Sequence, residues 1–208
     1  MPFIIYALPR SRTAWLSRFL TYNDYTCYHE QAIFARSLSD IKTFFKGNMG
    51  TAETAAAQGR PLIHYVCPDI KEVVILRPVN EVVESMIKAA EGIAAYNKPL
   101  LQRNMEYGDR QLRKMANDPN VLCVDYADLQ NEKTCAMIFE YCLPYQFDKD
   151  WWEFMKNKNV QANVGAIINY YHRHRADIEG FKRHCKSELR RLCYDGQIPM
   201  RKKKLCQV

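Results

Sequence analysis

A short loop near the N-terminus, Pro9-Arg10-Ser11-Arg12-Thr13-Ala14-Trp15, combines two cationic side chains with two hydroxyl groups. It follows the apolar run 3–8 and precedes apolar residues at helical spacing, so the sequence predicts a strand, a loop and a helix. The backbone N–H groups at a helix start and the positive end of the helix dipole favour an anion. We therefore expect this loop to bind a phosphate-like group.

The composition of the loop separates two kinds of phosphate site. A nucleotide-hydrolysing loop reads GxxxxGK[ST], in which glycines wrap the phosphate and a lysine reaches the terminal one. The present loop has neither glycine nor lysine, and at five of seven positions it resembles the 5′-phosphosulfate loop of the sulfotransferase family, commonly P-[KR]-S-G-T-T-[WL]. Ala14 replaces the second threonine of that pattern. Arg12 replaces its glycine. A residue with a side chain is disfavoured at positive φ, which a tight turn of this kind can require.

A second polar segment, Arg77 to Ser85, begins 67 residues after Arg10 and follows the apolar run 72–76. It resembles the sulfotransferase segment R-x-P-x-D-x-x-x-S, in which the arginine and the serine hold the 3′-phosphate of the nucleotide. The eight-position spacing is kept, although Pro78 directly follows the arginine and Asn80-Glu81 stands where aspartate is usual. Because Pro78 can begin a helix, a guanidinium and a hydroxyl two turns along can close on one phosphate.

The same resemblance implies roles for the remaining site residues. Arg10 would neutralise the leaving phosphate, and Ser11, Thr13 and loop N–H groups would hold the 5′-phosphosulfate, with Arg12, Ala14 and Trp15 in the same cofactor loop. The segment Asp125-Tyr126-Ala127-Asp128-Leu129 resembles the family's Y-E-D-L segment, in which the tyrosine lies against the adenine. This implies an adenine contact for Tyr126, and simple packing at a strand end is the alternative.

Three residues are candidates for the base that removes the acceptor proton. Glu30 follows the predicted strand 25–28, and its Cys27-Tyr28-His29-Glu30 setting resembles that of the glutamate in protein-tyrosine sulfotransferases and several bacterial relatives. Since the carboxyl ends of parallel strands open on one crevice, we expect Glu30 near the loop. His29 is the second candidate. His64, in the run 61–66, is the third, because cytosolic sulfotransferases use a histidine on a K-T-H-like strand; a core histidine is the alternative there.

The elements that must position these residues follow from the apolar periodicity. The sequence predicts strands over residues 3–8, 25–28, 61–66, 72–76 and 121–124, and helices over 40–46, 51–58, 79–94, 98–115, 133–143 and 164–192. This pattern indicates an α/β fold with a central parallel sheet of about four or five strands. The resemblance implies the three-layer P-loop NTPase-like version. We expect one domain over residues 1–208, with a core over 1–156, a helical part over 157–195 and a basic tail over 196–208.

The amino-acid composition limits the classes of protein to which the chain can belong. The 208 residues are 48% hydrophobic and 25% charged, which is typical of a globular chain, and the net charge of +7 suits an anionic ligand without favouring nucleic acid by itself. Eight cysteines without a CxxC pair, and the lack of a signal-peptide pattern, predict reduced thiols and a cytoplasmic protein. No stretch approaches the roughly 20 apolar residues of a membrane span, and no zinc-ligand spacing is visible.

The resemblance as a whole, which spans residues 1–156, implies an enzyme. It would transfer a sulfuryl group from 3′-phosphoadenosine 5′-phosphosulfate (PAPS) to a hydroxyl or amine acceptor, either a small molecule or a macromolecule. The product would be 3′,5′-diphosphoadenosine (PAP), and no metal would be required. One alternative is a nucleotide or metabolite kinase on the same fold, which needs a lysine and a magnesium-binding Ser/Thr in the loop. The other is a non-catalytic nucleotide- or nucleic-acid-binding protein that uses the basic C-terminal half.

Overall fold

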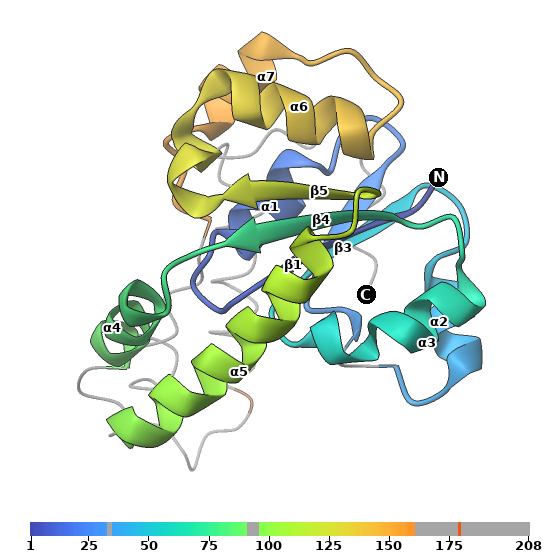
Figure 1. The fold of residues 1–208 in the computed structure, drawn as a ribbon. Helices are drawn as coiled ribbons and strands as arrows, with labels where there is room; N and C mark the ends of the chain where they lie inside the picture. The colour runs from blue at the N-terminus through green and yellow to red at the C-terminus, as the bar shows by residue number, and fades with distance from the viewer. Residues whose placement is uncertain (33–34, 91–95, 161–178, 180–208) are drawn as a thin grey trace.

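The structure, a computed structural model, describes residues 1–32, 35–90, 96–160 and 179. Its centre is a parallel sheet with the strand order β2-β3-β1-β4-β5. The strands are β1 (Phe3–Ala7), β2 (Thr26–His29), β3 (Met49–Glu53), β4 (Lys71–Leu76) and β5 (Val121–Asp125). Helices cover both faces of this sheet (Figure 1), so the predicted three-layer α/β fold is confirmed.

Two groups of helices form the outer layers. One face of the sheet packs against α1 (Thr13–Phe19), α6 (Glu132–Cys142) and α7 (Lys149–Met155). The other face carries α2 (Leu38–Phe44), α3 (Arg60–Val66), α4 (Val79–Ala89) and α5 (Lys98–Ala116). Two short 3₁₀ helices, η2 (Ala56–Gly59) and η3 (Tyr126–Gln130), follow β3 and β5.

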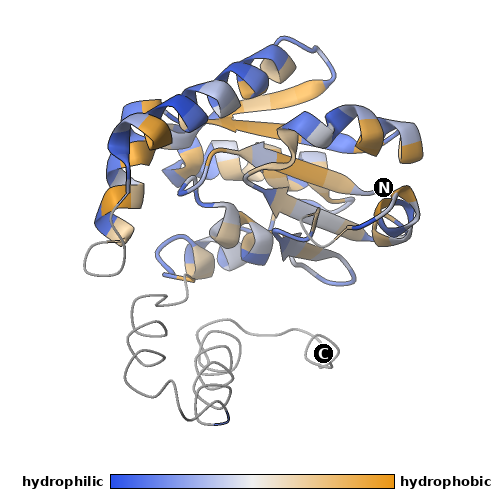
Figure 2. Cartoon of the chain, turned by 90° about the horizontal axis from the view of Figure 1, so that it is seen from below, coloured by the Kyte–Doolittle hydropathy of each residue, from blue (hydrophilic) through white to orange (hydrophobic). Residues whose placement is uncertain are grey.

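The central strand β1 is buried on both faces, as a continuous apolar run predicts for a parallel sheet. Phe3, Ile5 and Ala7 belong to the core between the sheet and α1, α6 and α7. Ile4 and Tyr6 alternate with them and face the opposite core, beneath α3, α4 and α5. Figure 2 shows the apolar strands between helices whose outer surfaces are hydrophilic. The loop that follows β1 is thereby fixed at the middle of the molecule.

Two predicted elements are wrong. Residues 51–58 are not a helix, because Met49–Glu53 forms β3 between β1 and β2, where backbone pairing and burial override the helix propensity of alanine. Residues 61–66 are not a strand, because Arg60–Val66 forms helix α3. Pro61 lies in the first turn of α3, where its fixed φ suits a helix and its missing N–H costs nothing.

The other predicted elements that fall on described residues agree with the structure to within a few residues, whereas helix α7 was not predicted. Ser37 caps α2 by accepting a hydrogen bond from the backbone N–H of Asp40. Helix α4 begins at Val79, as predicted, and Pro78 precedes it as the N-cap with an extended ψ of 130°. Apart from residue 179, the predicted helix over 164–192 and the basic tail over 196–208 lie outside the described residues.

Two further observations concern the described part of the chain. Its five cysteines, Cys27, Cys67, Cys123, Cys135 and Cys142, are free thiols. None of its helices has both the length and the apolar character needed to cross a membrane. The cytoplasmic location stays a prediction.

A close approach between β1 and β3 gives the first testable prediction. Gly50 pairs with Phe3 across the sheet, and a Cβ atom at Gly50 would overlap the Phe3 ring. We expect Gly50→Ala to lower the free energy of unfolding by about 1–3 kcal/mol, the usual cost of overpacking a core. Gly59→Ala is the matched control, because a Cβ there would meet nothing within 4 Å. Chemical denaturation measures both, and equal stabilities of the two variants would contradict this account of β3.

Candidate functional site

The loop between β1 and α1 makes a tight turn without glycine. Arg10 has φ 65° and Arg12 has φ 62°, so both adopt the left-handed conformation. For residues with a side chain this conformation costs roughly 1–2 kcal/mol each. Arg12 thus adopts a conformation that glycine reaches without that cost. The strain requires compensating contacts.

Arg12 makes those contacts with its side chain. Its Nη1 donates to the carbonyl of Leu129 at 3.1 Å, and its Nη2 donates to the carbonyl of Lys156 at 3.1 Å. The guanidinium also lies 4.4 Å from the centre of the Trp15 ring. Burial lowers the pKa of Arg12 from its ordinary value. The side chain therefore ties the loop to η3 and the end of α7, and we leave it out of the proposed nucleotide contacts.

Trp15 is part of the same set of contacts between the loop and the end of α7. It is buried, its Nε1 donates to the carbonyl of Met155 at 2.8 Å, and its ring stacks on Phe19 at 4.8 Å between centroids. With Arg12 over its ring, Trp15 is a core residue of this structure. The predicted cofactor contact of Trp15 is therefore not part of the site proposed below. Ala14, which precedes it in α1, offers only its backbone and a methyl group.

Ser11 and Thr13 occupy the interior of the loop. Ser11 is fully buried, and its hydroxyl has no hydrogen-bond partner among the described residues. An unpartnered buried hydroxyl is costly unless something else supplies its hydrogen bond. Thr13 is also buried, and its Oγ1 lies 3.0 Å from Nε2 of His29 at the end of β2. A phosphate or sulfate oxygen is a ligand that would satisfy the Ser11 hydroxyl.

The two distant arginines meet at this loop. Arg77 follows β4, the neighbour of β1 in the sheet, and its Nη1 donates to the backbone carbonyl of Arg10. The Nε of Arg10 in turn donates to Oγ of Ser85 in α4, at 3.3 Å. Residues 10, 77 and 85 therefore form one connected cluster at the carboxyl ends of β1 and β4. The cationic side chains of Arg10 and Arg77 both belong to this cluster, and such groups favour an anion as ligand.

Tyr126 joins the cluster from the end of β5. The Arg77 guanidinium lies 4.0 Å from the centre of the Tyr126 ring, so one face of the ring is occupied by this cation. Arg77 Nε also contacts Oε2 of Glu81, one turn into α4, at 3.3 Å. These two contacts orient the Arg77 guanidinium, with an aromatic ring on its flat face and a carboxylate at its edge.

The two candidate bases at the end of β2 lie beside the loop. Glu30 has φ 58°, and its Oε2 accepts from the backbone N–H of Thr54 at 3.4 Å. Its Oε1 lies 3.7 Å from Nε2 of His29, which itself contacts Thr13. Burial lowers the pKa of His29 and so favours the neutral imidazole, while the carboxylate of Glu30 has the smaller, opposite effect. The structure therefore brings Glu30 and His29 together with the loop.

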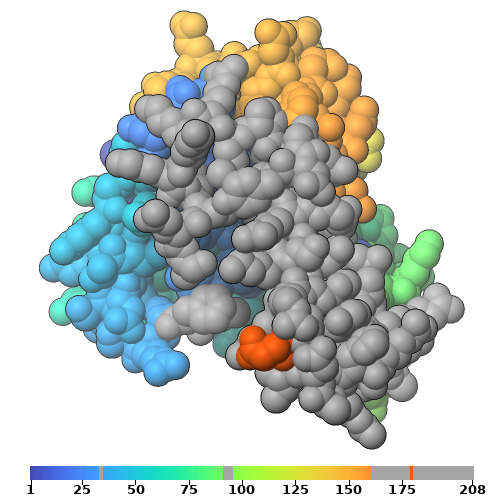
Figure 3. Space-filling view, turned by 180° about the vertical axis from the view of Figure 1, so that it is seen from behind, coloured from blue at the N-terminus to red at the C-terminus, as the bar shows by residue number. Residues whose placement is uncertain are grey.

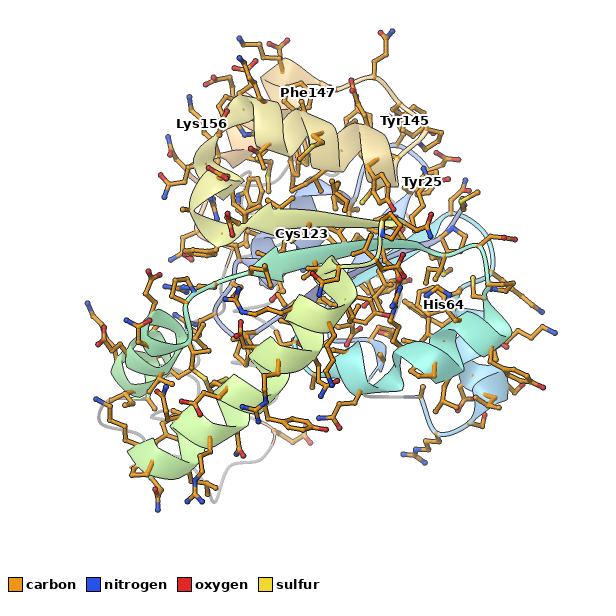
Figure 4. All side chains as sticks on the ribbon, viewed as in Figure 1. Tyr25, His64, Cys123, Tyr145, Phe147 and Lys156 are labelled. Atoms are coloured by element: carbon orange, nitrogen blue, oxygen red, sulfur yellow. The ribbon has the colours of Figure 1, made fainter. Side chains whose placement is uncertain are left out.

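His64 lies elsewhere. Because residues 60–66 form a helix, His64 is carried to the N-terminal end of β4, where its Nε2 lies 3.0 Å from Oε2 of Glu72. Figure 4 shows His64 at the end of the sheet opposite to the arrowheads of β4 and β5. Arg60 makes an ion pair with the same carboxylate at 2.6 Å. His64 thus lies beside a structural ion pair and is not near the loop.

Glu53 is a buried carboxylate that the sequence did not reveal. It is the last residue of β3, opposite Tyr6 in β1, and it is 1% exposed. Burial is the main cause that raises its pKa. The stretch 51–58 looked like a helix, so nothing marked residue 53 as a strand end. A glutamate that closes a run of small residues was the one available signal.

Comparison with known proteins supports the fold but finds no match by sequence. No protein-family model matches the chain. No curated protein matches it either. Among solved structures, the mouse sulfotransferase SULT7A1 complexed with PAP is similar, with a TM-score of 0.55 and 13% sequence identity. The chain has a sulfotransferase fold. The match covers 74% of this chain and 63% of the mouse chain, and at this identity the shared sulfotransferase fold establishes architecture alone.

The Arg12 contacts give the second prediction. We expect Arg12→Ala to lower the free energy of unfolding by about 2–3 kcal/mol, since hydrogen bonds from a charged group to buried carbonyls are lost. Arg12→Gly should lose about 1 kcal/mol less, because glycine adopts the left-handed conformation without strain. Urea denaturation of both variants measures the difference. A glycine variant less stable than the alanine variant would contradict the proposed strain at residue 12.

Proposed function

We propose that this protein is a sulfotransferase that uses PAPS as the sulfuryl donor and a hydroxyl or amine compound as the acceptor. The observation that carries the proposal is the meeting of Arg10, Arg77 and Ser85 in one cluster. These residues come from two motifs that resemble the two phosphate-binding segments of sulfotransferases. A fold shared with a PAP-bound mouse sulfotransferase is independent support.

The donor would lie across the carboxyl ends of β1 and β4. Ser11, whose buried hydroxyl has no partner among the described residues, and Thr13 would hold the 5′-phosphosulfate. Arg77 and Ser85 would hold the 3′-phosphate, and the edge or free face of Tyr126 would contact the adenine. Arg10 would lie between the two phosphates. Its Nε donates to Ser85 and its backbone carbonyl accepts from Arg77, so its side chain can serve either phosphate.

When bound, PAPS would supply the sulfuryl group. The bond between sulfur and the 5′-phosphate oxygen would break while the acceptor oxygen or nitrogen forms its bond to sulfur. Arg10 stabilises the negative charge that develops on the departing phosphate oxygen. Glu30 accepts the proton that the acceptor loses, and its Oε1 lies 3.7 Å from Nε2 of His29. Positioning and charge stabilisation of this kind account for most of the catalysis of related phosphoryl transfers.

The third prediction concerns the 3′-phosphate. We expect Arg77→Ala to weaken PAP binding by more than about tenfold, because a charged hydrogen-bonding partner of the phosphate is removed. Isothermal titration calorimetry measures the affinity. Arg113→Ala is the control, since Arg113 is an exposed arginine that pairs with Asp109 on α5. Equal affinities of the Arg77 and Arg113 variants for PAP would remove Arg77 from the site.

The fourth prediction concerns the base. We expect Glu30→Gln to bind PAP like the wild type but to transfer sulfuryl groups about a hundredfold more slowly, since the amide cannot accept the acceptor proton. Transfer from radiolabelled PAPS to a panel of phenols, alcohols and amines measures the rate. Glu132→Gln, which alters an exposed glutamate on α6, is the control. Full activity of the Glu30 variant would move the role to His29.

A further inference from the structure

A cavity of about 290 Å³ opens beside the end of β3. This volume is at the lower limit of small-molecule pockets, enough for one ring with a short chain. Its apolar walls come from α2, α3 and the residue after α2, and the side chains that form them are Ile41, Phe44, Phe45, Leu62 and Ile63. No residue of α2 is fully buried, and the light-blue segment that holds this helix lies on the outer surface in Figure 3. We name this space the β3 cavity.

The charged groups that line the β3 cavity are all acidic. Among the described residues around it, Glu53 and Asp40 are the ionisable ones. Oε1 of Glu53 accepts hydrogen bonds from the Thr51 hydroxyl and from the backbone N–H of Ala32, the latter at 2.8 Å. Oε2 of Glu53 is buried and has no hydrogen-bond partner among the described residues. The cavity therefore combines an apolar wall with a carboxylate of which one oxygen, Oε2, has no donor among the described residues.

The β3 cavity is connected to the nucleotide site by a short series of contacts. Thr13, in the loop, lies within hydrogen-bond distance of His29. The neighbouring Glu30 accepts from the backbone N–H of Thr54, which directly follows Glu53. The proposed base, Glu30, thus lies between the phosphate loop and the β3 cavity. An acceptor must reach this position.

We propose that the β3 cavity binds the acceptor substrate and that this acceptor is a small apolar molecule that carries a protonated amine, paired with Glu53, and, as a separate group, the hydroxyl that receives the sulfuryl group and gives its proton to Glu30. The inference rests on the proposed function and narrows its acceptor class. A neutral hydroxyl could supply the missing hydrogen bond but would leave the buried carboxylate charge uncompensated. An ammonium group supplies both the donor and the opposite charge. A carboxylic acid would be repelled by both acidic residues.

Three probes of similar size test the head group. 2-Phenylethylamine, 2-phenylethanol and phenylacetate each carry a phenyl ring on a chain of two carbons, the second of which is the carboxylate carbon in phenylacetate, and ligand-observed NMR at pH 7.5 gives their affinities for the full chain. We expect the amine to bind at least about tenfold more tightly than the alcohol, the usual effect of adding a charge to a buried hydrogen bond. Phenylacetate should not bind. An alcohol that binds as tightly as the amine, or no binding of the amine, would overturn the inference.

Two variants of the cavity test the partner. Glu53→Gln keeps the size of the side chain and one acceptor oxygen but removes the charge, so the amine should bind about tenfold more weakly and the alcohol unchanged. Asp40→Asn, at the exposed rim, should change amine binding by less than about twofold because solvent screens the charge. Unchanged amine affinity in a folded Glu53→Gln protein overturns the assignment. If circular dichroism shows that this variant does not fold, the wild-type series decides alone.

Parallel titrations with PAP separate this inference from the proposed function. PAP binding without amine selectivity would overturn the acceptor assignment only. Amine selectivity without PAP binding would overturn the proposed sulfotransferase function, and the β3 cavity would remain an amine site of another kind.

Discussion

The hydrogen bond from the Arg77 guanidinium to the backbone carbonyl of Arg10 connects the two halves of the candidate site. It fastens the loop after β1 to the end of β4, and Ser85 extends the connection into α4. Two strands paired in parallel make this possible, because their carboxyl ends meet at the same edge of the sheet. The rest of the fold can be understood as support for this contact.

The loop itself shows how a glycine-free turn can be held. Arg10 and Arg12 both have positive φ, and the guanidinium of Arg12 offsets strain by binding the carbonyls of Leu129 in η3 and Lys156 at the end of α7. The side chain that replaces glycine is thus used as a tie to the α6–α7 layer. The cationic groups that remain for the proposed nucleotide are then Arg10 and Arg77, and Ser11 in the same loop is fully buried.

Much of this arrangement was predictable from the sequence, because buried strands and phosphate-binding loops are local patterns. The run 3–8, the loop after it and the Arg77–Ser85 spacing all placed their residues at the correct edge of the sheet. Long-range pairing was not predictable. Residues 49–53 become a strand because Gly50 leaves room for Phe3 in the neighbouring strand, and no local signal shows this. That error hid Glu53, and the separate error over 61–66, which is helix α3 and not a strand, kept His64 among the candidate bases.

The central claim is that a single adenosine with two phosphates spans the cluster, with one phosphate at the loop and the other at Arg77 and Ser85. Calorimetric titration of the wild-type chain with PAP, 5′-AMP and 3′-AMP tests it most directly, because the three ligands differ only in which phosphates they carry. The account predicts that PAP binds at least about tenfold more tightly than either monophosphate, since each phosphate has its own charged partners. Binding of 5′-AMP as tight as that of PAP would show that the 3′-phosphate has no site, and would contradict the account.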